Sequence, residues 1–450
     1  MVLHYVSRES IEKVTDRRQI ADCLRLNILY MNQIGGGHLG SAFSIVDILT
    51  ALYWQERKRS DVIFSSKGHD VAAFYAVLIA KGGIPESEMH NFRRLGGLSG
   101  HPDKIIMPFH TGSLGMGLSK AQGMAIADKI HGIDRRIFVI CGDGEMQEGQ
   151  IWEALRNIKN RNLSNIHLII DCNGWQCDRK IDETSDNGNL GVKLMNFGWT
   201  VRSFDGHDYD DLSRVLAEIS HRTDQPKAFI AKTEKGIWGK PFHAGRLTME
   251  DYGRAAEDII ARLPMGISIY EREYQGYFPI EKANTFLPFY HTYLSAYREN
   301  QKIILCNADL LSDCGLSGFE KEERFLEFGI SEQDMVSTAG ALAKQGFLPI
   351  VHSFAAFLCR RANEQIYNNC CEGDRVIYVG AMAGRIPPGP GPTHECLDDI
   401  ALMKTMPGME ILWPKDEREV GTALLYAVYG TTNPVYIRLA CLPGVEGMRE

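Results

Sequence analysis

The sequence has no run of basic residues. Its 49 Lys and Arg residues are outnumbered by 57 Asp and Glu residues, and the formal net charge is −8 at pH 7. Surfaces that bind nucleic acid usually contain a basic patch or stripe, because they must neutralise phosphates. We therefore expect no nucleic acid partner.

Long apolar runs are missing as well. Charged residues occur from Arg8 onward, and no stretch approaches the ~20 apolar residues that a membrane-spanning helix needs. The first residues also lack the apolar core of a signal peptide. These features predict a protein without a membrane partner, located in the cytoplasm.

Paired cysteine motifs are also lacking. The eleven cysteines are scattered, with Cys370 and Cys371 adjacent, and none has the C-x-x-C spacing of zinc or redox sites. We expect buried, reduced thiols that pack as small apolar side chains.

The sequence does contain an alternation of apolar, strand-like runs with helical patterns and glycine-rich turns. This alternation predicts an α/β fold with mainly parallel sheets flanked by helices. At 450 residues the chain is too long for one core. We expect a first domain over residues 1–265, a connection over 266–290, where periodicity weakens, and a second domain over 291–450.

Several elements are predicted individually. In the first domain, strands are expected at 136–141 and 166–170, joined by a helix over 147–160. In the second domain, the patterns predict strands at 302–306, 348–352, 375–379 and 435–439, and helices at 334–344 and 417–429.

Two polar residues follow the two expected strands of the first domain. Asp143, in Gly142-Asp143-Gly144, follows the first strand, and Asn173 lies 30 residues further on, after the second. Neighbouring parallel strands end at the same sheet edge, so these two oxygen-bearing side chains should meet there. Mg²⁺ prefers oxygen ligands, and glycine lets backbone amides approach a diphosphate. The pattern predicts a site for Mg²⁺, which Ca²⁺ or Mn²⁺ could replace.

A G-D-G followed by an asparagine at this distance is the thiamine diphosphate signature, and the chain resembles transketolases over residues 20–440. Short segments spread across both domains carry the resemblance. They are Gly36-Gly37-His38-Leu39-Gly40, Ser66-Lys67-Gly68-His69, Gly100-His101-Pro102, Thr111-Gly112-Ser113-Leu114-Gly115, Gly329-Ile330-Ser331-Glu332 and Gly391-Pro392-Thr393-His394.

The resemblance implies two thiamine-diphosphate-binding-fold domains, the first for metal and diphosphate and the second for the pyrimidine. Asp143, Asn173 and the carbonyl group of Trp175 would be the metal ligands. The cofactor-binding residues that the resemblance implies are His69, Gly112, Ser113, Leu114, Asp143, Gly144, Glu145, Asn173, Trp175, Cys177, Lys235, His243, Glu332, Phe354 and Phe357.

Glu332 has a definite chemical task in such a protein. Thiamine diphosphate acts only after its C2 proton is lost, and a carboxyl group bonded to the pyrimidine nitrogen favours the tautomer that removes this proton. We expect Glu332 to be buried, with a pKa raised by desolvation.

The resemblance also implies the reaction. A two-carbon ketol unit would move from a ketose donor, as a sugar or sugar phosphate, to an aldehyde acceptor through a cofactor-bound dihydroxyethyl carbanion. Every step moves a proton on a sugar oxygen, which suits imidazoles with pKa values near neutrality. The residues expected to act with Glu332 are His38, His101, His243 and His394, with Arg438 as a further substrate ligand.

The substrate-reading positions depart from the family pattern. Where transketolases read a donor hydroxyl with an aspartate, this chain has Pro390, and the usual acceptor-phosphate histidine and serine correspond to Met382 and Asp313. Pro390 has no side-chain hydrogen-bonding group, and Asp313 would repel a phosphate. Arg438 could still bind one. We expect an atypical sugar, unphosphorylated or otherwise modified.

The sequence leaves more than one possibility open for the assembly and for the activity. The resemblance implies a homodimer with active sites at the subunit interface. Transketolases usually continue into a third, C-terminal domain, which we expect this chain of 450 residues to lack; a separate subunit could supply that domain. The nearest alternative is a deoxyxylulose-phosphate-synthase-like or 2-oxo-acid-decarboxylating enzyme. His38, His101 and Gln147-Glu148-Gly149 argue against this alternative, because they are more similar to transketolase. A non-catalytic regulatory subunit is the alternative outside enzymes.

Overall fold

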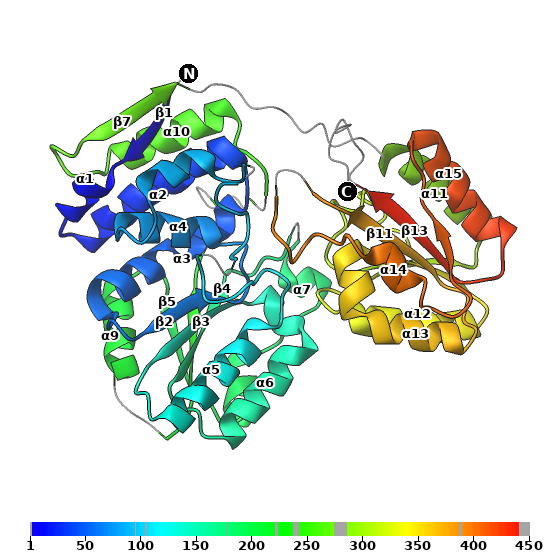
Figure 1. Cartoon of the computed structure of the whole chain (residues 1–450), viewed down its shortest axis with the longest axis horizontal. Coiled ribbons are helices and arrows are strands. Elements are labelled where there is room, and N and C mark those ends of the chain that lie inside the picture. The colour runs from blue at the N-terminus through cyan, green and yellow to red at the C-terminus, as the bar shows by residue number, and fades with distance from the viewer. Residues whose placement is uncertain are drawn as a thin grey trace. The chain divides into compact units, whose positions relative to one another are not determined.

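The chain divides into two compact units. The computed structural model describes residues 2–94, 96–103, 106–177, 179–220, 224–236, 242, 244–273, 286–386 and 389–440. Unit 1 comprises Met1–Trp175 and Asn187–Tyr277, and unit 2 comprises Gln176–Asp186 and Phe278–Glu450. Figure 1 labels their helices and strands.

Unit 1 is built on a parallel five-stranded sheet in the order β2-β3-β4-β6-β5. The registers place Gly142 beside Asp171 at the carboxyl edge, between β3 and β4. The strands are β2 (Val62–Ser65), β3 (Ile137–Gly142), β4 (Ile166–Cys172), β5 (Thr200–Asp205) and β6 (Lys227–Lys232).

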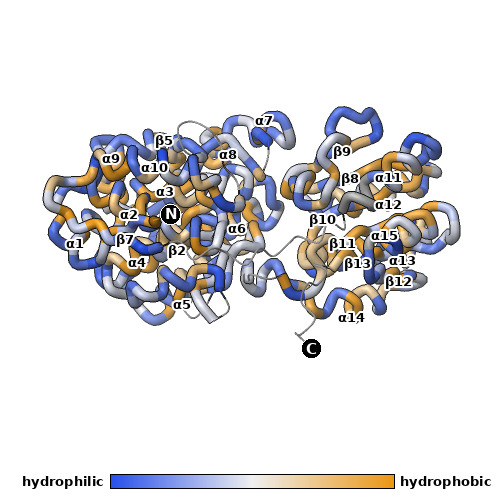
Figure 2. The backbone as a smooth tube through the Cα atoms, turned by 90° about the horizontal axis from the view of Figure 1, so that it is seen from above, coloured by the Kyte–Doolittle hydropathy of each residue, from blue (hydrophilic) through white to orange (hydrophobic). Residues whose placement is uncertain are grey.

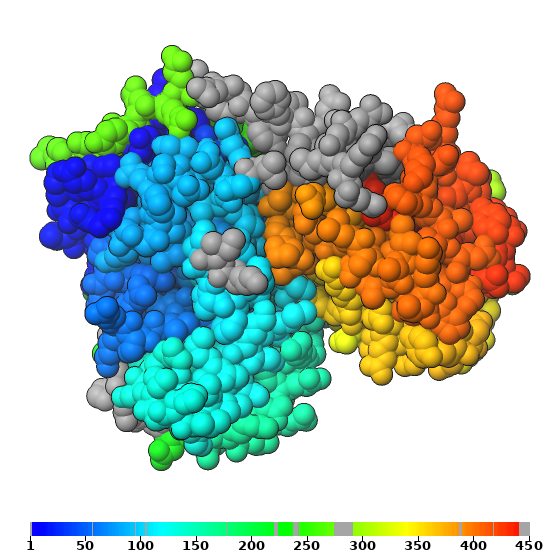
Figure 3. All heavy atoms as spheres, in the orientation of Figure 1, coloured from blue at the N-terminus to red at the C-terminus, as the bar shows by residue number. Residues whose placement is uncertain are grey.

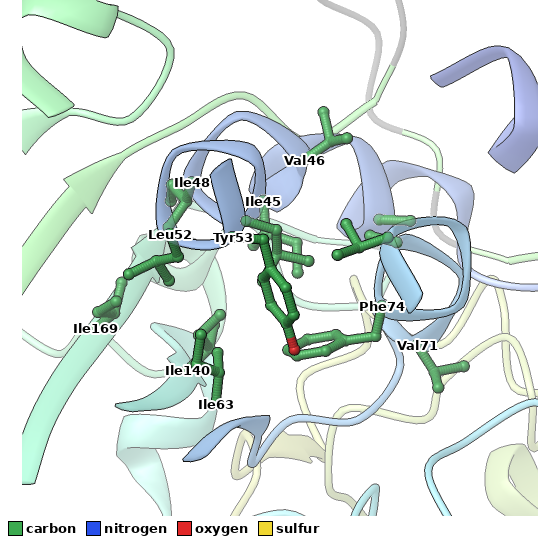
Figure 4. Packing of buried hydrophobic residues seen from close by; sticks show 14 of the residues in the cluster. Ile45, Val46, Ile48, Leu52, Tyr53, Ile63, Val71, Phe74, Ile140 and Ile169 are labelled. Carbon is green, nitrogen blue, oxygen red and sulfur yellow. The ribbon is translucent and has the colours of Figure 1, made fainter. Parts of the chain in front are cut away.

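Helices pack against this sheet, and segments coloured blue to teal form most of the face of unit 1 that the space-filling view shows (Figure 3). Ile45 and Ile48 of one helix pack near Ile140 and Ile169 of the sheet (Figure 4). The helical elements of unit 1 are α1 (Arg8–Glu12), α2 (Arg17–Gly35), α3 (Leu39–Ala51), η1 (Leu52–Glu56), α4 (Val71–Ala80), η2 (Glu86–Asn91), α5 (Gly117–His131), η3 (Gly144–Gln147), α6 (Gly149–Asn160), α8 (Leu190–Asn196), α9 (Tyr209–Ser220) and α10 (Met249–Ile260).

A second, two-stranded sheet extends unit 1 beyond the expected domain end. β1 (Val2–Val6) pairs antiparallel with β7 (Ile269–Glu273), so that Tyr5 lies opposite Tyr270. Residues 269–273 therefore belong to unit 1, although the sequence predicts a connection from residue 266. Their alternation was hidden because four of the five side chains of β7 are exposed.

Unit 2 has a parallel six-stranded sheet in the order β12-β13-β11-β10-β8-β9. Its central strands are apolar and its surface loops hydrophilic (Figure 2). The strands are β8 (Ile303–Asn307), β9 (Phe325–Glu327), β10 (Leu348–Phe354), β11 (Ile377–Ala383), β12 (Glu410–Leu412) and β13 (Val435–Ala440). The helical elements are α7 (Ile181–Thr184), α11 (Phe286–Glu299), α12 (Glu332–Lys344), η4 (Phe357–Arg361), α13 (Asn363–Cys371), α14 (Asp399–Met403), α15 (Glu417–Leu425) and η5 (Tyr426–Gly430).

The expected α/β fold is thus confirmed, with two sheets that are parallel in every pairing. All six predicted strands are present within a few residues of their expected bounds. Among the described helices, none is long and apolar enough to cross a membrane. The ten described cysteines form no disulfide, and seven of them are buried.

Candidate functional site

The carboxyl edge of the unit 1 sheet brings Asp143 to the loop of Asn173. Asp143 Oδ2 accepts a hydrogen bond from Gly174 N at 2.6 Å, and Asp143 Oδ1 accepts one from Gly144 N at 2.9 Å. Asn173 Oδ1 accepts from Trp175 N at 3.0 Å. Asp143, Asn173 and Trp175, the three expected metal-binding residues, therefore lie close together at the carboxyl edge of the sheet. This follows from the strand order, because β3 and β4 are neighbours.

The charges at this edge are unbalanced. Asp70, Asp143 and Asp171 are all buried, and Lys67 lies 2.5 Å from Asp171 and 3.5 Å from Asp70. Burial, and next the charge of Asp171, raise the pKa of Asp143 to about 7. Burial would also raise the pKa of Asp171, but Lys67 holds it below its usual range.

These residues fit a divalent cation. Among the described residues, the carboxyl groups of Asp70, Asp143 and Asp171 outnumber the ammonium group of Lys67, and a cation would neutralise the negative charge that they carry when all are ionised. The donors are carboxylate, amide and carbonyl oxygens, the set that Mg²⁺ prefers. In the described part of the chain, no group of three or more His, Cys, Asp or Glu side chains is placed so that it could hold a metal ion, so a metal here would depend on Asn173 and on backbone oxygen.

Glu145 ties three loops together at the same edge. Its Oε1 accepts hydrogen bonds from Ser66 Oγ at 2.5 Å and from Gly115 N at 2.9 Å, and its Oε2 accepts one from Gly142 N at 3.3 Å. Burial raises its pKa, against the effect of these hydrogen bonds. The carboxylate of Glu145 thus links the segments of Ser66 and Gly115 to the end of β3.

Three of the expected histidines gather in unit 1. The ring centroid of His38 lies 5.6 Å from that of His69 and 5.4 Å from that of His101. Gly112, at φ 117°, lies against them, because a Cβ added there would be 2.6 Å from Cδ2 of His101. Glycine at this position therefore allows the loop of Ser113 and Leu114, both half-buried, to approach the histidines.

The two residues before Lys235 make contacts that the sequence did not predict. Thr233 Oγ1 donates to Asp171, and Glu234 N donates to Nε2 of His207 at 3.0 Å. His207 Nδ1 lies 2.8 Å from Asp47. Lys235 itself is buried. His243, the remaining expected histidine of this region, lies outside the described residues.

In unit 2, Glu332 begins α12 and is 2% exposed. Its Oε1 and Oε2 lie 3.1 and 3.0 Å from Nη1 of Arg361. The expected burial of Glu332 is confirmed. Its arginine partner was missed, because the two residues are 29 positions apart and belong to different elements.

The expected aromatic residues of unit 2 stack beside this ion pair. Phe354 ends β10 and Phe357 begins η4, with ring centroids 5.5 Å apart and planes at 27°. His394 lies 5.3 Å from Phe357, edge to face. Phe354, Phe357 and His394 therefore form one aromatic surface.

The segment of Trp175 and Cys177 spans the division between units. Trp175 belongs to unit 1, whereas Cys177 belongs to unit 2, where its side chain packs against the core. Cys177 N donates to Oδ2 of Asp309 at 3.4 Å.

The remaining expected substrate residue, Arg438, is already paired. Its Nε donates to Asp399 Oδ2 at 2.8 Å, and Trp413 lies 4.5 Å from its guanidinium carbon. Both Arg438 and Asp399 are buried. The positive charge is therefore largely neutralised inside the unit, which weakens it as a phosphate ligand.

Strained backbone marks two positions at the carboxyl edge of the unit 2 sheet. Asp309 follows β8 at φ 56°, and Met382 in β11 has φ 52°. A left-handed φ is unusual for a side chain such as methionine, and such strain concentrates at functional sites. Met382 is also one of the positions that depart from the family pattern.

Comparison with known proteins agrees with the two units. Residues 16–263 match the family model described as "Transketolase, thiamine diphosphate binding domain", and residues 285–440 match "Transketolase, pyrimidine binding domain". Transketolase-like protein 2 of Mus musculus is 29% identical over 94% of this chain and 73% of its own length. Human transketolase is 28% identical over 90% of this chain and 71% of its own length.

A shorter relative and one solved structure complete the comparison. The protein named "6-deoxy-6-sulfo-D-fructose transketolase subunit SqwG", from Clostridium sp. (strain MSTE9), is 34% identical over 52% of this chain and 90% of its own length. Transketolase from Leishmania mexicana has a TM-score of 0.51 at 21% identity, covering 95% of this chain and 78% of that one; it supports the fold alone. Because a family model matches more than half of the residues, this chain belongs to the transketolase family.

Proposed function

We propose that this chain is a thiamine-diphosphate-dependent transferase that moves a two-carbon ketol unit from a ketose to an aldehyde. The observation that carries this proposal is the cluster of His38, His69 and His101, with Gly112 against His101. Three imidazoles so close together suit a reaction that moves protons on several sugar hydroxyl groups. Release of carbon dioxide from a 2-oxo acid makes no comparable demand.

The residues of unit 1 would hold the diphosphate end of the cofactor. Asp143, Asn173 and the carbonyl group of Trp175 would bind Mg²⁺, which Ca²⁺ or Mn²⁺ could replace. His69, Gly144 and Lys235 would contact the diphosphate, through donors and positive charge. The support for the cation site is that Asp143 is buried at the same sheet edge as Asp70 and Asp171.

The residues of unit 2 would hold the pyrimidine end. When bound, thiamine diphosphate supplies a carbon that stabilises negative charge. Glu332 would hold a proton at the pyrimidine ring nitrogen, and Phe354 with Phe357 would exclude water from the ring. His394, edge-on to Phe357, would move a proton at the donor's oxygen.

We further propose that the substrate is an atypical sugar. Met382, Asp313 and Pro390 replace the family's polar readers, and the charge of Arg438 is balanced by Asp399. The relative named for a 6-deoxy-6-sulfo-D-fructose transketolase suggests sulfonated ketoses as donors to test. We also propose a homodimer in the cytoplasm, with active sites between subunits; the word "subunit" in that relative's name makes a separate additional chain a second arrangement to examine.

One experiment tests the reaction and the substrate together. Purified protein with thiamine diphosphate and Mg²⁺ is incubated with pairs of ketoses and aldehydes, each in free, phosphorylated and sulfonated form, and products are identified by mass spectrometry. We expect two-carbon transfer, with no preference for the phosphorylated forms. Carbon dioxide release from pyruvate without ketol transfer would contradict the reaction, and a strong preference for phosphate would contradict the substrate class.

The assembly has its own test. Light scattering during size-exclusion chromatography, with and without cofactor, should give the mass of a dimer. A monomer that is fully active would contradict active sites shared between subunits.

A further inference from the structure

The ion pair between Glu332 and Arg361 is buried on both sides. The side chain of Glu332 is 3% exposed and that of Arg361 is 8% exposed. A single nitrogen, Nη1, lies 3.1 Å from one carboxylate oxygen and 3.0 Å from the other. A carboxylate held in this way is charge-compensated before any ligand reaches it.

Local backbone geometry puts Arg361 in this place. η4 is a π-helical turn in which the N–H of Ala362 donates to the carbonyl group of Phe357 at 3.2 Å, five residues earlier. Such turns are rare and often occur at functional sites. The turn leaves the guanidinium carbon of Arg361 5.1 Å from the ring centroid of Phe357. Arg361 therefore contacts the carboxylate and one ring of the aromatic surface together.

Glu332 can accept more hydrogen bonds than Arg361 gives it. An ionised carboxylate offers about four lone-pair positions on its two oxygens, and in the described residues the hydrogen bonds to these oxygens come from Nη1 of Arg361. Because an ionised carboxylate can only accept, the hydrogen of a further bond must come from the ligand.

We propose that Arg361 is the positioning residue for Glu332, keeping its carboxylate ionised and oriented so that a bound pyrimidine must take up a proton on its ring nitrogen. This rests on the proposed binding of thiamine diphosphate. A pyrimidine nitrogen that is neutral in solution would then gain a proton as it binds. Without the guanidinium, the buried carboxyl group would already carry that proton, and binding would take up none at this position.

Calorimetry tests the proposal without measuring turnover. Binding of thiamine diphosphate with Mg²⁺ is measured near pH 7.5 in buffers of different ionisation enthalpy, for the wild-type chain and for Arg361→Met. We expect proton uptake to fall by about one per site in the variant. The metal and diphosphate residues lie in unit 1 and are unchanged, so their protons cancel in the difference.

Two further variants sharpen the comparison. Arg361→Lys keeps the charge and should retain the proton uptake of the wild type. Arg360→Met is the matched control, since Arg360 is the preceding residue of the same turn and pairs with Asp398 at 2.5 Å, with a side chain 43% exposed. It should leave proton uptake unchanged. If Arg361→Met does not fold, Arg361→Gln, which keeps N–H donors without charge, replaces it.

The outcomes separate the two proposals. Equal proton uptake in the wild type and in Arg361→Met or Arg361→Gln overturns the role of Arg361, whatever the change in affinity. Absence of thiamine diphosphate binding by the wild-type chain overturns the proposed function instead.

Discussion

The two units balance their buried charges differently. In unit 1, the ammonium group of Lys67 pairs with both Asp70 and Asp171, and Asp143 is buried at the same sheet edge. In unit 2, Glu332 is paired with Arg361, and Asp399 is paired with Arg438. Unit 1 therefore carries excess negative charge that a metal ion would neutralise, whereas these unit 2 carboxylates are already compensated.

This difference predicts what each unit can bind. Excess charge at the edge of unit 1 favours a cation with its anionic ligand. Compensated pairs beside stacked rings in unit 2 favour a flat, neutral ring that makes directed hydrogen bonds. In the proposed function, the diphosphate end of the cofactor accordingly binds to unit 1 and the pyrimidine end binds to unit 2.

The largest expected effect is at Glu332. Glu332→Gln should lower ketol transfer by at least ~100-fold, because the amide cannot hold the proton at the ring nitrogen. Initial rates with saturating cofactor measure this effect, with Asp334→Asn on the same helix as a control. A variant that retains more than half of the activity would refute the role of Glu332.

The choice of glutamine over alanine follows from the ion pair. Glu332→Gln keeps an oxygen that can accept a hydrogen bond from Arg361, whereas Glu332→Ala removes this acceptor together with the charge. Breaking a buried ion pair in this way typically costs ~3–5 kcal/mol of folding free energy. Loss of activity in that variant would then mix a chemical effect with unfolding.

The second largest effect is expected at Lys67 of unit 1, which pairs with two carboxyl groups, whereas Arg361 and Arg438 of unit 2 are each paired with one. Lys67→Met removes the ammonium group that pairs with the buried Asp70 and Asp171, and should lower the free energy of unfolding by ~3–5 kcal/mol. The double variant Lys67→Met/Asp171→Asn should recover part of that loss, because it removes one of the stranded charges. Urea unfolding measures both, and a loss below ~1 kcal/mol for Lys67→Met would refute the compensation.

Two buried histidines test both units at once. His167 in β4 and His352 in β10 are neutral in the fold, because burial lowers the pKa of each to about 3. The unfolded chain binds their protons near pH 6.5, so the folded state loses stability as pH falls from 6.5 towards 3. The loss should approach ~1.4 kcal/mol per pH unit for each histidine.

Phenylalanine variants isolate these contributions. His167→Phe, between Phe138 and Phe229, and His352→Phe, beside Tyr293, should each reduce the slope of unfolding free energy against pH between 6 and 4. An unchanged slope in either variant would mean that other groups dominate acid unfolding of that unit.

The sequence predicted the fold well because apolar strands in parallel sheets are continuous runs. β4 and β10 are buried along nearly their whole length, so their patterns are unmistakable. β7 was missed for the opposite reason, since it is short and mostly exposed and forms only by pairing with β1. Local pattern contains no information on such a partner.

The residues of the candidate site also differ in how well the sequence predicts them. Asp143, Glu332 and Phe357 were predicted because each belongs to a short motif whose neighbours are adjacent in sequence. Arg361 and His207 were missed because their roles arise from pairings across 29 and 160 residues. The sequence predicts that the carboxylate of Glu332 is buried, but it does not predict which distant cation compensates its charge.

The smallest expected effect concerns the strained backbone of unit 2. Met382 holds φ 52° with a side chain that rarely adopts it, so Met382→Gly should raise the free energy of unfolding by up to ~1 kcal/mol. Asn162, at φ 51° in unit 1, is the matched control, since asparagine tolerates this conformation. Asn162→Gly should change stability by only a few tenths of that amount. If Met382→Gly is more stable but transfers ketol units more slowly, the strain at Met382 serves substrate binding. If both the stability and the rate are unchanged, the left-handed φ at Met382 has no energetic cost. The edge of the unit 2 sheet would then be no more strained than the loop at Asn162 in unit 1.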